Sequence, residues 1–295
     1  RMKRRTFLKT TSLALGAGVG LAPYARVLGA NDDVRVATVG FRGQGSLHMR
    51  LLRELPGVRV VGFCDADRDV LARGLREAEK RNEKVEAYVD VRKLLENKGI
   101  DAVTTATPDH WHALVTVWAC QAGKDVYVEK PLCHNLFEGR KTIEAAEKYG
   151  RIVEWGNQNH GHDTGEVQLE VEDRGKIRVV YTSLNRMRQS IGKVDGPQPV
   201  PESVDYNLWC GPAPKEPLMR RRLHYDWHWV WPTGTGEIGN NGIYPLDACR
   251  LRLGQKTLPK RVMSLGGRFL FDDDGETPNT HLALFEYDPG PLVIF

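Results

Sequence analysis

The sequence has few cysteines, and their spacing argues against both a disulfide-stapled domain and a cysteine-based zinc domain. There are five, an odd number with no C-x-x-C pair, at Cys64, Cys120, Cys133, Cys210 and Cys249. We therefore expect mostly buried thiols rather than a disulfide framework. Six further candidate ligands are histidines whose spacing matches no zinc motif, so no metal is predicted: His110, His112, His160, His162, His224 and His228.

A long apolar run and a general excess of basic residues are also missing. The apolar run near the N-terminus, residues 13–22, is too short for a transmembrane helix, which needs about 20 residues. Six basic residues within residues 1–30 more than account for the formal net charge of +4, so residues 31–295 carry a net charge of −2. We therefore expect neither an integral membrane span nor a nucleic-acid partner.

The first thirty residues resemble a twin-arginine export signal. The paired Arg4 and Arg5 precede a Phe-Leu-Lys tripeptide and the apolar run. Such signals carry folded proteins across the membrane, which predicts a periplasmic or other extracytoplasmic location. Cleavage is expected near residues 29–30, although Leu28 is larger than the residue usual at that place, so an uncleaved, anchored form stays open. An amphipathic or disordered tail is the alternative.

From residue 34 onward, short β-branched runs alternate with longer helical stretches. Strands are predicted at 34–39, 58–63, 87–89, 102–106, 126–128 and 152–155, and helices at 44–54, 68–80, 91–97, 110–122, 135–149 and 163–173. This alternation is typical of α/β proteins with a doubly wound parallel sheet. We therefore expect an N-terminal Rossmann domain over residues 31–156.

Beyond residue 176 the pattern indicates fewer helices and longer strands. A strand-like stretch at 177–188 leads into a region rich in Pro and Gly, followed by a helix at about 237–253 and strands near 260–271 and 280–287. This predicts a C-terminal α+β domain over residues 157–295, built on a mostly antiparallel sheet. The last residues, 292–295, look like an interrupted strand that would leave an unpaired apolar edge, so a C-terminally incomplete domain is expected.

A glycine-rich turn directly after the first strand predicts a dinucleotide site. Its six residues are Gly40, Phe41, Arg42, Gly43, Gln44 and Gly45. Glycines there let a pyrophosphate approach the positive end of the following helix. The spacing departs from G-x-G-x-x-G, but Asp65, about 20 residues later, would accept hydrogen bonds from the adenosine ribose. That carboxylate favours NAD, while Arg42 leaves NADP possible. A tight turn with a surface Asp is the alternative.

Two further motifs resemble those of the Gfo/Idh/MocA oxidoreductases. Residues 107–113 read Thr-Pro-Asp-His-Trp-His-Ala, and residues 128–132 read Val-Glu-Lys-Pro-Leu. With the glycine turn and with residues 239–247, the likeness covers nearly all of residues 34–295. The resemblance implies an NAD(P)-dependent oxidoreductase that acts on CH–OH groups of sugars or polyols. It places five side chains at the cofactor: Thr107, Pro108, His112, Glu129 and Lys130. Lys130 would also face the substrate hydroxyl.

One position departs from the family pattern. The family commonly carries Asp-x-x-x-His on the first helix of the second domain, where this chain has Asn240 and Tyr244. Four-residue spacing puts both side chains on one helix face. Asn240 cannot take a proton, whereas Tyr244 resembles the tyrosine at this place in glucose-fructose oxidoreductase, another exported member. A core aromatic is the alternative for Tyr244.

Together these residues predict a catalytic group of Lys130, Tyr244 and Asn240. Oxidising an alcohol requires removal of a proton from oxygen as hydride leaves carbon. Free Tyr and Lys both have pKa values of about 10. Beside an oxidised, positively charged nicotinamide, we expect nearby cations to lower the pKa of Tyr244, and desolvation and like charge to lower that of Lys130. Tyr244 would then carry the proton, Lys130 would polarise the oxygen and Asn240 would orient the sugar.

Substrate contacts are expected from two further segments. Residues 222–231 are rich in aromatic and charged side chains, which suit the faces and hydroxyls of a sugar, and residues 156–162 follow the sixth strand. The predicted substrate-binding residues are Gln158, His160, Arg222, His224 and Trp229. Domain packing is the alternative for residues 222–231.

Export would separate the protein from the cytoplasmic nicotinamide pool, so we expect a tightly bound, recycled cofactor. The net reaction stays open between a dehydrogenase, a coupled oxidoreductase of two sugars, and an NAD-dependent glycosidase that acts through transient sugar oxidation. A non-catalytic sugar-binding protein is the remaining alternative, because the Asp-x-x-x-His pair is lost. The family resemblance also implies a homo-oligomer.

Overall fold

The computed structural model of the chain describes residues 33–157 and 177–295. The predicted helix at 163–173, the export signal, Gln158 and His160 lie outside these residues. None of the helices in the described ranges is long and apolar enough to cross a membrane. All five cysteines are free, and three of them, Cys64, Cys120 and Cys210, are buried.

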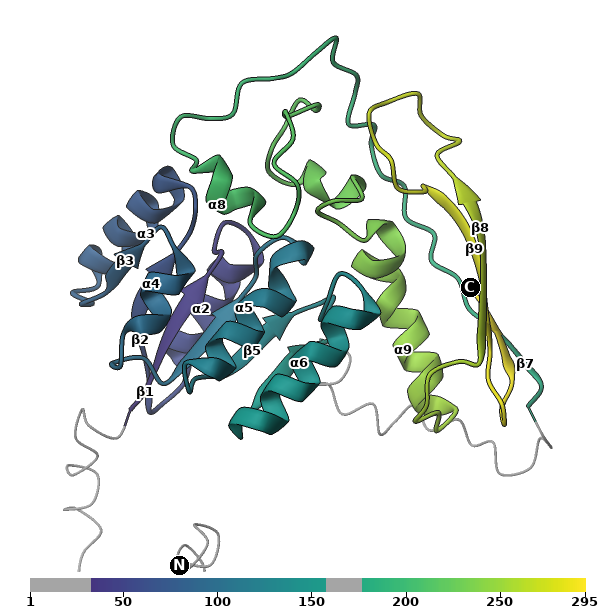
Figure 1. Ribbon diagram of the computed structural model, residues 1–295, viewed down its shortest axis with the longest axis horizontal. Coiled ribbons are helices and arrows are strands. Elements are labelled where there is room, and N and C mark those ends of the chain that lie inside the picture. Colours follow the sequence, from purple (N-terminus) through teal and green to yellow (C-terminus); the bar gives the residue numbers. More distant parts are fainter. Residues whose placement is uncertain (1–32, 158–176) are drawn as a thin grey trace, which may run out of the picture. The chain divides into compact units, whose positions relative to one another are not determined.

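The first sheet has six parallel strands in the order β3-β2-β1-β4-β5-β6. The strands are β1 (Val34–Val39), β2 (Val58–Cys64), β3 (Glu86–Tyr88), β4 (Ala102–Thr105), β5 (Asp125–Glu129) and β6 (Val153–Gly156). The helices between them are α2 (Gln44–Glu54), α3 (Arg68–Lys80), α4 (Val91–Glu96), α5 (Asp109–Gln121) and α6 (Leu136–Tyr149). This is the doubly wound order of a Rossmann fold, so the predicted α/β class is confirmed. Figure 1 shows this sheet in purple to teal.

Local sequence signals set the helix ends. The Asp67 side chain caps α3 by accepting a hydrogen bond from the Asp69 amide, and Asn135 caps α6 through the Glu138 amide. Gly150 ends α6 in the left-handed region at φ 59°. The sheet core packs apolar strand residues against α4 and α5, with Leu94, Val103, Val115 and Val128 fully buried.

The second sheet has four strands in the order β7-β10-β9-β8. They are β7 (Val179–Tyr181), β8 (Arg261–Gly267), β9 (Thr280–Glu286) and β10 (Leu292–Ile294). β9 pairs antiparallel with β8 and β10, and β10 pairs parallel with β7. The sheet is therefore mostly antiparallel, as predicted. The expected unpaired edge at residues 292–295 is wrong, because β10 lies inside the sheet with a partner on each side.

The connections of the second half are less regular than predicted. The strand expected at 177–188 ends at Tyr181, because Arg186 and Arg188 reach Asn241 and Glu237 instead of continuing the sheet. The predicted helix at 237–253 begins as a π-helical turn, Ile238–Gly242, and continues as α9 (Ile243–Arg252). Two short elements were not predicted: helix α8 (Tyr206–Cys210) and the 3-10 turn Asp226–Trp229.

Candidate active site

A cavity of about 640 Å³ lies at the carboxyl ends of the first sheet's strands. Ligands of α/β proteins bind at this edge, and the volume is in the range of small-molecule sites. One wall comes from the turns after β1, β2, β4 and β5. The other comes from residues Leu208–His228 and from Tyr244 of α9. The predicted residues that line the cavity are Gly40, Arg42, Gly43, Gln44, Asp65, Thr107, Pro108, His112, Glu129, Lys130, Arg222, His224 and Tyr244.

The glycine turn fits a pyrophosphate. Gly40 adopts φ +70°, and a Cβ there would lie 2.9 Å from backbone atoms of Thr107. A Cβ on Gly43 would meet nothing within 4 Å, and α2 begins after Gly43 without a side-chain cap. The Ser46 amide donates to Gly43 O (3.0 Å), so the two amides before it in α2 are the ones left for an anion.

Two residues of the turn do not line the cavity. Phe41 is buried beneath the turn, with its ring centroid 5.1 Å from that of Phe63. Gly45 is also buried, and a Cβ there would lie 2.1 Å from the Gly40 carbonyl oxygen. Both residues shape the turn from below, so the contact predicted for them with the cofactor is indirect.

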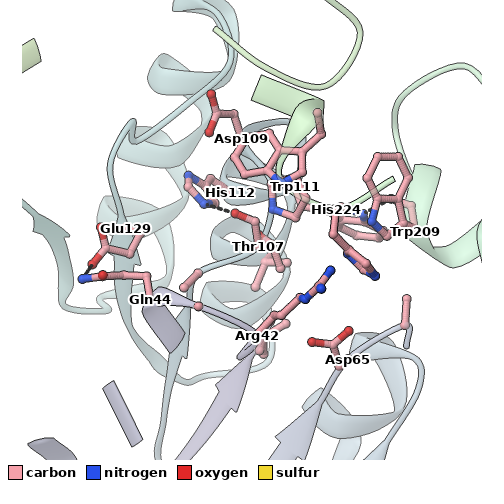
Figure 2. A pocket seen from close by; sticks show the side chains of 18 of the residues that line it. Arg42, Gln44, Asp65, Thr107, Asp109, Trp111, His112, Glu129, Trp209 and His224 are labelled. Atoms are coloured by element: carbon pink, nitrogen blue, oxygen red, sulfur yellow. Dashed lines mark hydrogen bonds between the residues drawn. The ribbon is translucent and has the colours of Figure 1, made fainter. Parts of the chain in front are cut away.

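Asp65 lies at the end of β2, where the adenosine ribose is expected. Its carboxylate accepts hydrogen bonds from the amides of Phe41 (3.2 Å) and Asp67 (3.0 Å). Burial raises the pKa of Asp65 to about 6, although these two hydrogen bonds and Arg42 act in the opposite direction. Figure 2 shows the Arg42 side chain on the same side of the pocket as Asp65 and His224.

His224 lies at this ribose end rather than beside Lys130. Its Nε2 is 3.0 Å from an Asp67 carboxylate oxygen. β2, which leads to Asp67, is three strand positions away from β5, which leads to Lys130. His224 is therefore not placed to contact a sugar bound at Lys130, contrary to the prediction. The Asp67 side chain draws it to the cofactor half of the cavity.

Residues 203–205, which lead into α8 of the second wall, are bound through their backbone to the turn after β2. The Arg68 amide donates to Ser203 O (2.8 Å), and the Asp205 amide donates to Ala66 O (2.9 Å). These hydrogen bonds hold the chain that leads into α8 next to the turn after β2.

His112 connects the turns after β4 and β5. It is 1% exposed, and its two ring nitrogens lie 2.8 Å from Thr107 O and 2.6 Å from Pro131 O. Figure 2 marks its contact with Thr107. Its neighbour Asp109 accepts hydrogen bonds from the Thr235 amide (3.1 Å) and hydroxyl (2.6 Å). Both side chains hold the site together.

Glu129 is held by three donors. Gln44 Nε2 lies 3.1 Å away, His48 Nε2 lies 2.9 Å away, and the Lys130 amide is 3.2 Å from the second carboxylate oxygen. Burial raises the pKa of Glu129. The hydrogen bonds from His48 and Gln44 and the charge of His48 act in the opposite direction, and the pKa is lowered on balance. Glu129 therefore fixes the start of the Lys130 turn to α2, as Figure 2 shows for Gln44.

Lys130 points across the cavity to the π-helical turn. Its Nζ donates to the Asn240 carbonyl (2.7 Å) and to Asn240 Oδ1 (2.6 Å), and lies 5.8 Å from the Tyr244 ring centroid. Burial lowers the pKa of Lys130, as expected, while Asp109, Glu129 and Glu237 partly oppose it. An ammonium group has three N–H donors, so one is left for a ligand oxygen.

Asn240 and Tyr244 differ from their predicted roles. Asn240 does not line the cavity, so it positions Lys130 instead of orienting a sugar. Tyr244 lines the cavity, but burial and Glu129 raise its pKa, and Arg186 opposes them only in part. Among the chain's own groups, burial and Glu129 thus outweigh Arg186, and the lowering expected beside a positively charged nicotinamide stays a prediction.

The aromatic segment 222–231 contributes differently from the prediction. Arg222 lines the cavity and binds Asp226 through two hydrogen bonds of 2.9 and 2.7 Å. Trp229 is buried under Arg188 and does not line the cavity. Its place is taken by Tyr225, Trp227 and His228. In the described residues, no group of three His, Cys, Asp or Glu side chains is placed to hold a metal ion.

Sequence reasoning missed Leu208 and Trp209 of α8, which also line the cavity. The one available signal was Asp205, whose side chain caps α8 through the Leu208 amide. A helix of five residues shows no periodicity, so this signal alone did not reveal it.

Two family models match the chain. The Gfo/Idh/MocA oxidoreductase model, described as an NAD-binding Rossmann fold, matches residues 34–157. The model of the same family's C-terminal alpha/beta domain matches residues 180–265. The matches thus cover both walls of the cavity.

Curated relatives and solved structures add two kinds of likeness. A glycosyl hydrolase family 109 protein of Shewanella pealeana is 29% identical over 55% of this chain and 41% of that protein. Inositol 2-dehydrogenase 1 of Saccharopolyspora erythraea is 35% identical over 38% of this chain and 36% of that protein. The chain thus matches less than half the length of each. The WlbA dehydrogenase of Bordetella pertussis, solved with NADH and UDP-GlcNAcA, shares the fold, with a TM-score of 0.63 at 17% identity over 89% of this chain and 71% of that one.

Proposed function

Since this chain belongs to the Gfo/Idh/MocA family of NAD-binding oxidoreductases, we propose that it transfers a hydride between NAD and a hydroxyl-bearing carbon of a sugar or polyol. The main support is that one cavity contains both the glycine turn and Lys130. NAD supplies the hydride acceptor. The chain's own residues bind the dinucleotide, hold the hydroxyl oxygen and exclude water.

Lys130 is the group that holds the hydroxyl oxygen. Asn240 accepts two of its three N–H donors, so the remaining one is available to the substrate. Hydrogen bonds from a charged donor are roughly twice as strong as neutral ones, and they strengthen as negative charge develops on the oxygen. Tyr244, whose raised pKa keeps it neutral, donates a second hydrogen bond from its phenol.

Export by the twin-arginine route is part of the proposal. A compartment without free nicotinamide cofactor favours a dinucleotide that stays bound and is reset on the protein. The tie between residues 203–205 and the end of β2 supports retention, because it holds the second wall against the ribose end.

The experiment is to purify the protein natively, identify bound dinucleotide by mass spectrometry, and follow absorbance at 340 nm after adding myo-inositol, glucose or a p-nitrophenyl glycoside. Lys130→Ala should keep the dinucleotide and lose turnover by about 10²-fold or more, because the oxygen loses its charged donor. Unchanged turnover in Lys130→Ala, or native protein without dinucleotide, would contradict the proposal.

A glycosidase that acts through transient oxidation is the second candidate, favoured by the 29% identity to a glycosyl hydrolase family 109 protein. It would release p-nitrophenol without net accumulation of NADH, whereas a dehydrogenase would accumulate NADH. A sugar-binding protein would show binding with neither signal.

A further inference from the structure

The three residues expected to perform catalysis include no ready proton acceptor. Asn240 has no basic group, and Lys130 is an ammonium that donates to Asn240. Burial and Glu129 raise the pKa of Tyr244, which keeps its proton on the phenol. Alcohol oxidation needs a base within reach of the hydroxyl. The base must therefore come from elsewhere in the cavity wall.

His228 is held in the cavity wall by aromatic rings. It lies on the 3-10 turn Asp226–Trp229, stacked on Trp227 with ring centroids 3.6 Å apart and planes at 17°. The rings of Tyr225 and Trp229 lie 5.0 and 5.6 Å from it. This packing fixes the plane of the imidazole.

The Tyr225 carbonyl fixes the tautomer of His228. It faces the Nδ1 of His228 and also accepts the His228 backbone amide at 3.2 Å. A carbonyl oxygen only accepts, so Nδ1 carries the hydrogen and the lone pair of neutral His228 lies on Nε2.

Tyr225 adopts a backbone conformation that is rare for a residue with a side chain, φ 71° and ψ −49°. Such conformations are costly and gather at functional sites. Here the conformation aims the Tyr225 carbonyl at the imidazole, and the buried Asp226, bound to Arg222, secures the turn.

Nε2 is the free edge of this ring. Within residues 33–157 and 177–295, no group forms a hydrogen bond to it, and His228 lines the same cavity as Lys130. Burial lowers the pKa of His228, the Tyr225 carbonyl and Asp109 act in the opposite direction, and Lys130 and Arg188 lower it further. The imidazole is therefore neutral and able to accept a proton near neutral pH.

We propose that His228 is the catalytic base of this site, an inference that depends on the proposed function. Its Nε2 takes the proton from the substrate hydroxyl, and the O–H electrons form the carbonyl double bond. The hydride of the same carbon passes to NAD⁺, which becomes NADH. Lys130 stays protonated and holds the oxygen. In the reverse direction His228 returns the proton to the carbonyl oxygen.

The first test needs no substrate. Protein labelled with ¹³C and ¹⁵N and loaded with NAD⁺ is titrated by NMR, and the His228 ring signals are assigned through their bonds to the sequentially assigned backbone. We expect a protonated Nδ1 and an unprotonated Nε2 at pH 7, with a pKa below the ordinary histidine value. A hydrogen on Nε2 in the neutral ring would overturn the proposal.

The second test uses the same sugars and glycosides. His228→Asn keeps a donor for the Tyr225 carbonyl but has no base, so hydride transfer should slow by about 10² to 10⁴-fold. The acidic limb of the kcat/KM profile should disappear, and added imidazole should restore part of the rate. His281→Asn, on β9 and outside the cavity, is the matched control and should behave as the wild type.

The outcomes separate the two proposals. Wild-type protein that oxidises none of the compounds would contradict the proposed function. Active wild type, with His228→Asn within about threefold of it, would overturn only the role of His228. If His228→Asn does not fold, the wild-type NMR pKa must match the acidic limb of the wild-type kcat/KM profile, and a mismatch would overturn the role.

Discussion

At the scale of single residues, the carboxyl group of Asp65 connects pH to dinucleotide affinity. Burial raises its pKa to about 6, so it gains a proton in mildly acidic solution. Ribose hydroxyls donate to the ionised form. Dinucleotide binding therefore lowers this pKa and releases a proton near pH 6.

The affinity for NAD should accordingly rise with pH up to about 6 and level off above it. Between pH 7 and pH 5 we expect a loss of about five- to tenfold, since one pKa unit corresponds to a factor of ten. Titration calorimetry in two buffers of different ionisation enthalpy measures both the affinity and the released proton. Asp65→Asn should bind with little pH dependence in this range. A flat wild-type profile would show that Asp65 does not contact the ribose.

Single residues were predictable where a motif determines their place. The glycine turn, Asp65 and Lys130 follow strand ends, so their meeting at one sheet edge follows from topology. The raised pKa of Tyr244 was not predictable, because it results first from burial in the fold and then from the charge of Glu129, more than one hundred positions away in the chain. The position of His224 was not predictable either, because it depends on a contact with Asp67, which is also distant in the chain.

At the scale of elements, helices α5 and α8 join the two walls of the cavity. Trp111 Nε1 and His110 Nε2 of α5 both lie within hydrogen-bond distance of the Trp209 carbonyl, at 3.0 and 3.1 Å. Gly211 ends α8 at φ +53°, and a Cβ there would lie 2.1 Å from the Trp111 ring. The close approach of α5 and α8 thus requires glycine at this position.

Gly211→Ala should therefore separate α8 from α5. We expect a destabilisation of about 2 kcal/mol, from the strained φ and the overlap with Trp111, together with weaker NAD binding. Thermal denaturation and NAD titration measure the two effects. Gly196→Ala is a suitable control, because a Cβ at Gly196 meets nothing within 4 Å. Equal melting of both variants would contradict the account.

Elements were predictable where they are long and periodic. Helices α2 and α3 match the predicted ranges 44–54 and 68–80. The irregular chain after β7 was mistaken for strand, because it directly continues the β-branched run of β7, whereas Arg188 binds Glu237 outside the sheet. A contact between distant segments decided this error, and local sequence patterns do not contain such contacts.

At the scale of the whole molecule, one ligand site joins segments that are far apart in sequence. The cavity combines the turn after β1 with Trp209, His228 and Tyr244. Any ligand that binds the folded form alone stabilises it by mass action.

Removing the dinucleotide should therefore lower the thermal stability of the protein. NAD at about 100 times its Kd contributes about 2.7 kcal/mol, which corresponds to roughly 5–10 °C in Tm. Differential scanning calorimetry of stripped and reloaded protein measures the shift. Nicotinamide mononucleotide, which lacks the adenosine half, should restore less of it. An unchanged Tm would contradict binding in this cavity.

The position of β10 between β7 and β9 constrains the order in which the second sheet forms during synthesis. β7 precedes β10 by more than one hundred residues, and β10 is its sole hydrogen-bonded neighbour among the described strands. The hairpin of β8 and β9 can form early, but β7 must wait until residues 292–294 have left the ribosome. Closing so long a loop is slow, so this sheet should fold after the nucleotide-binding half.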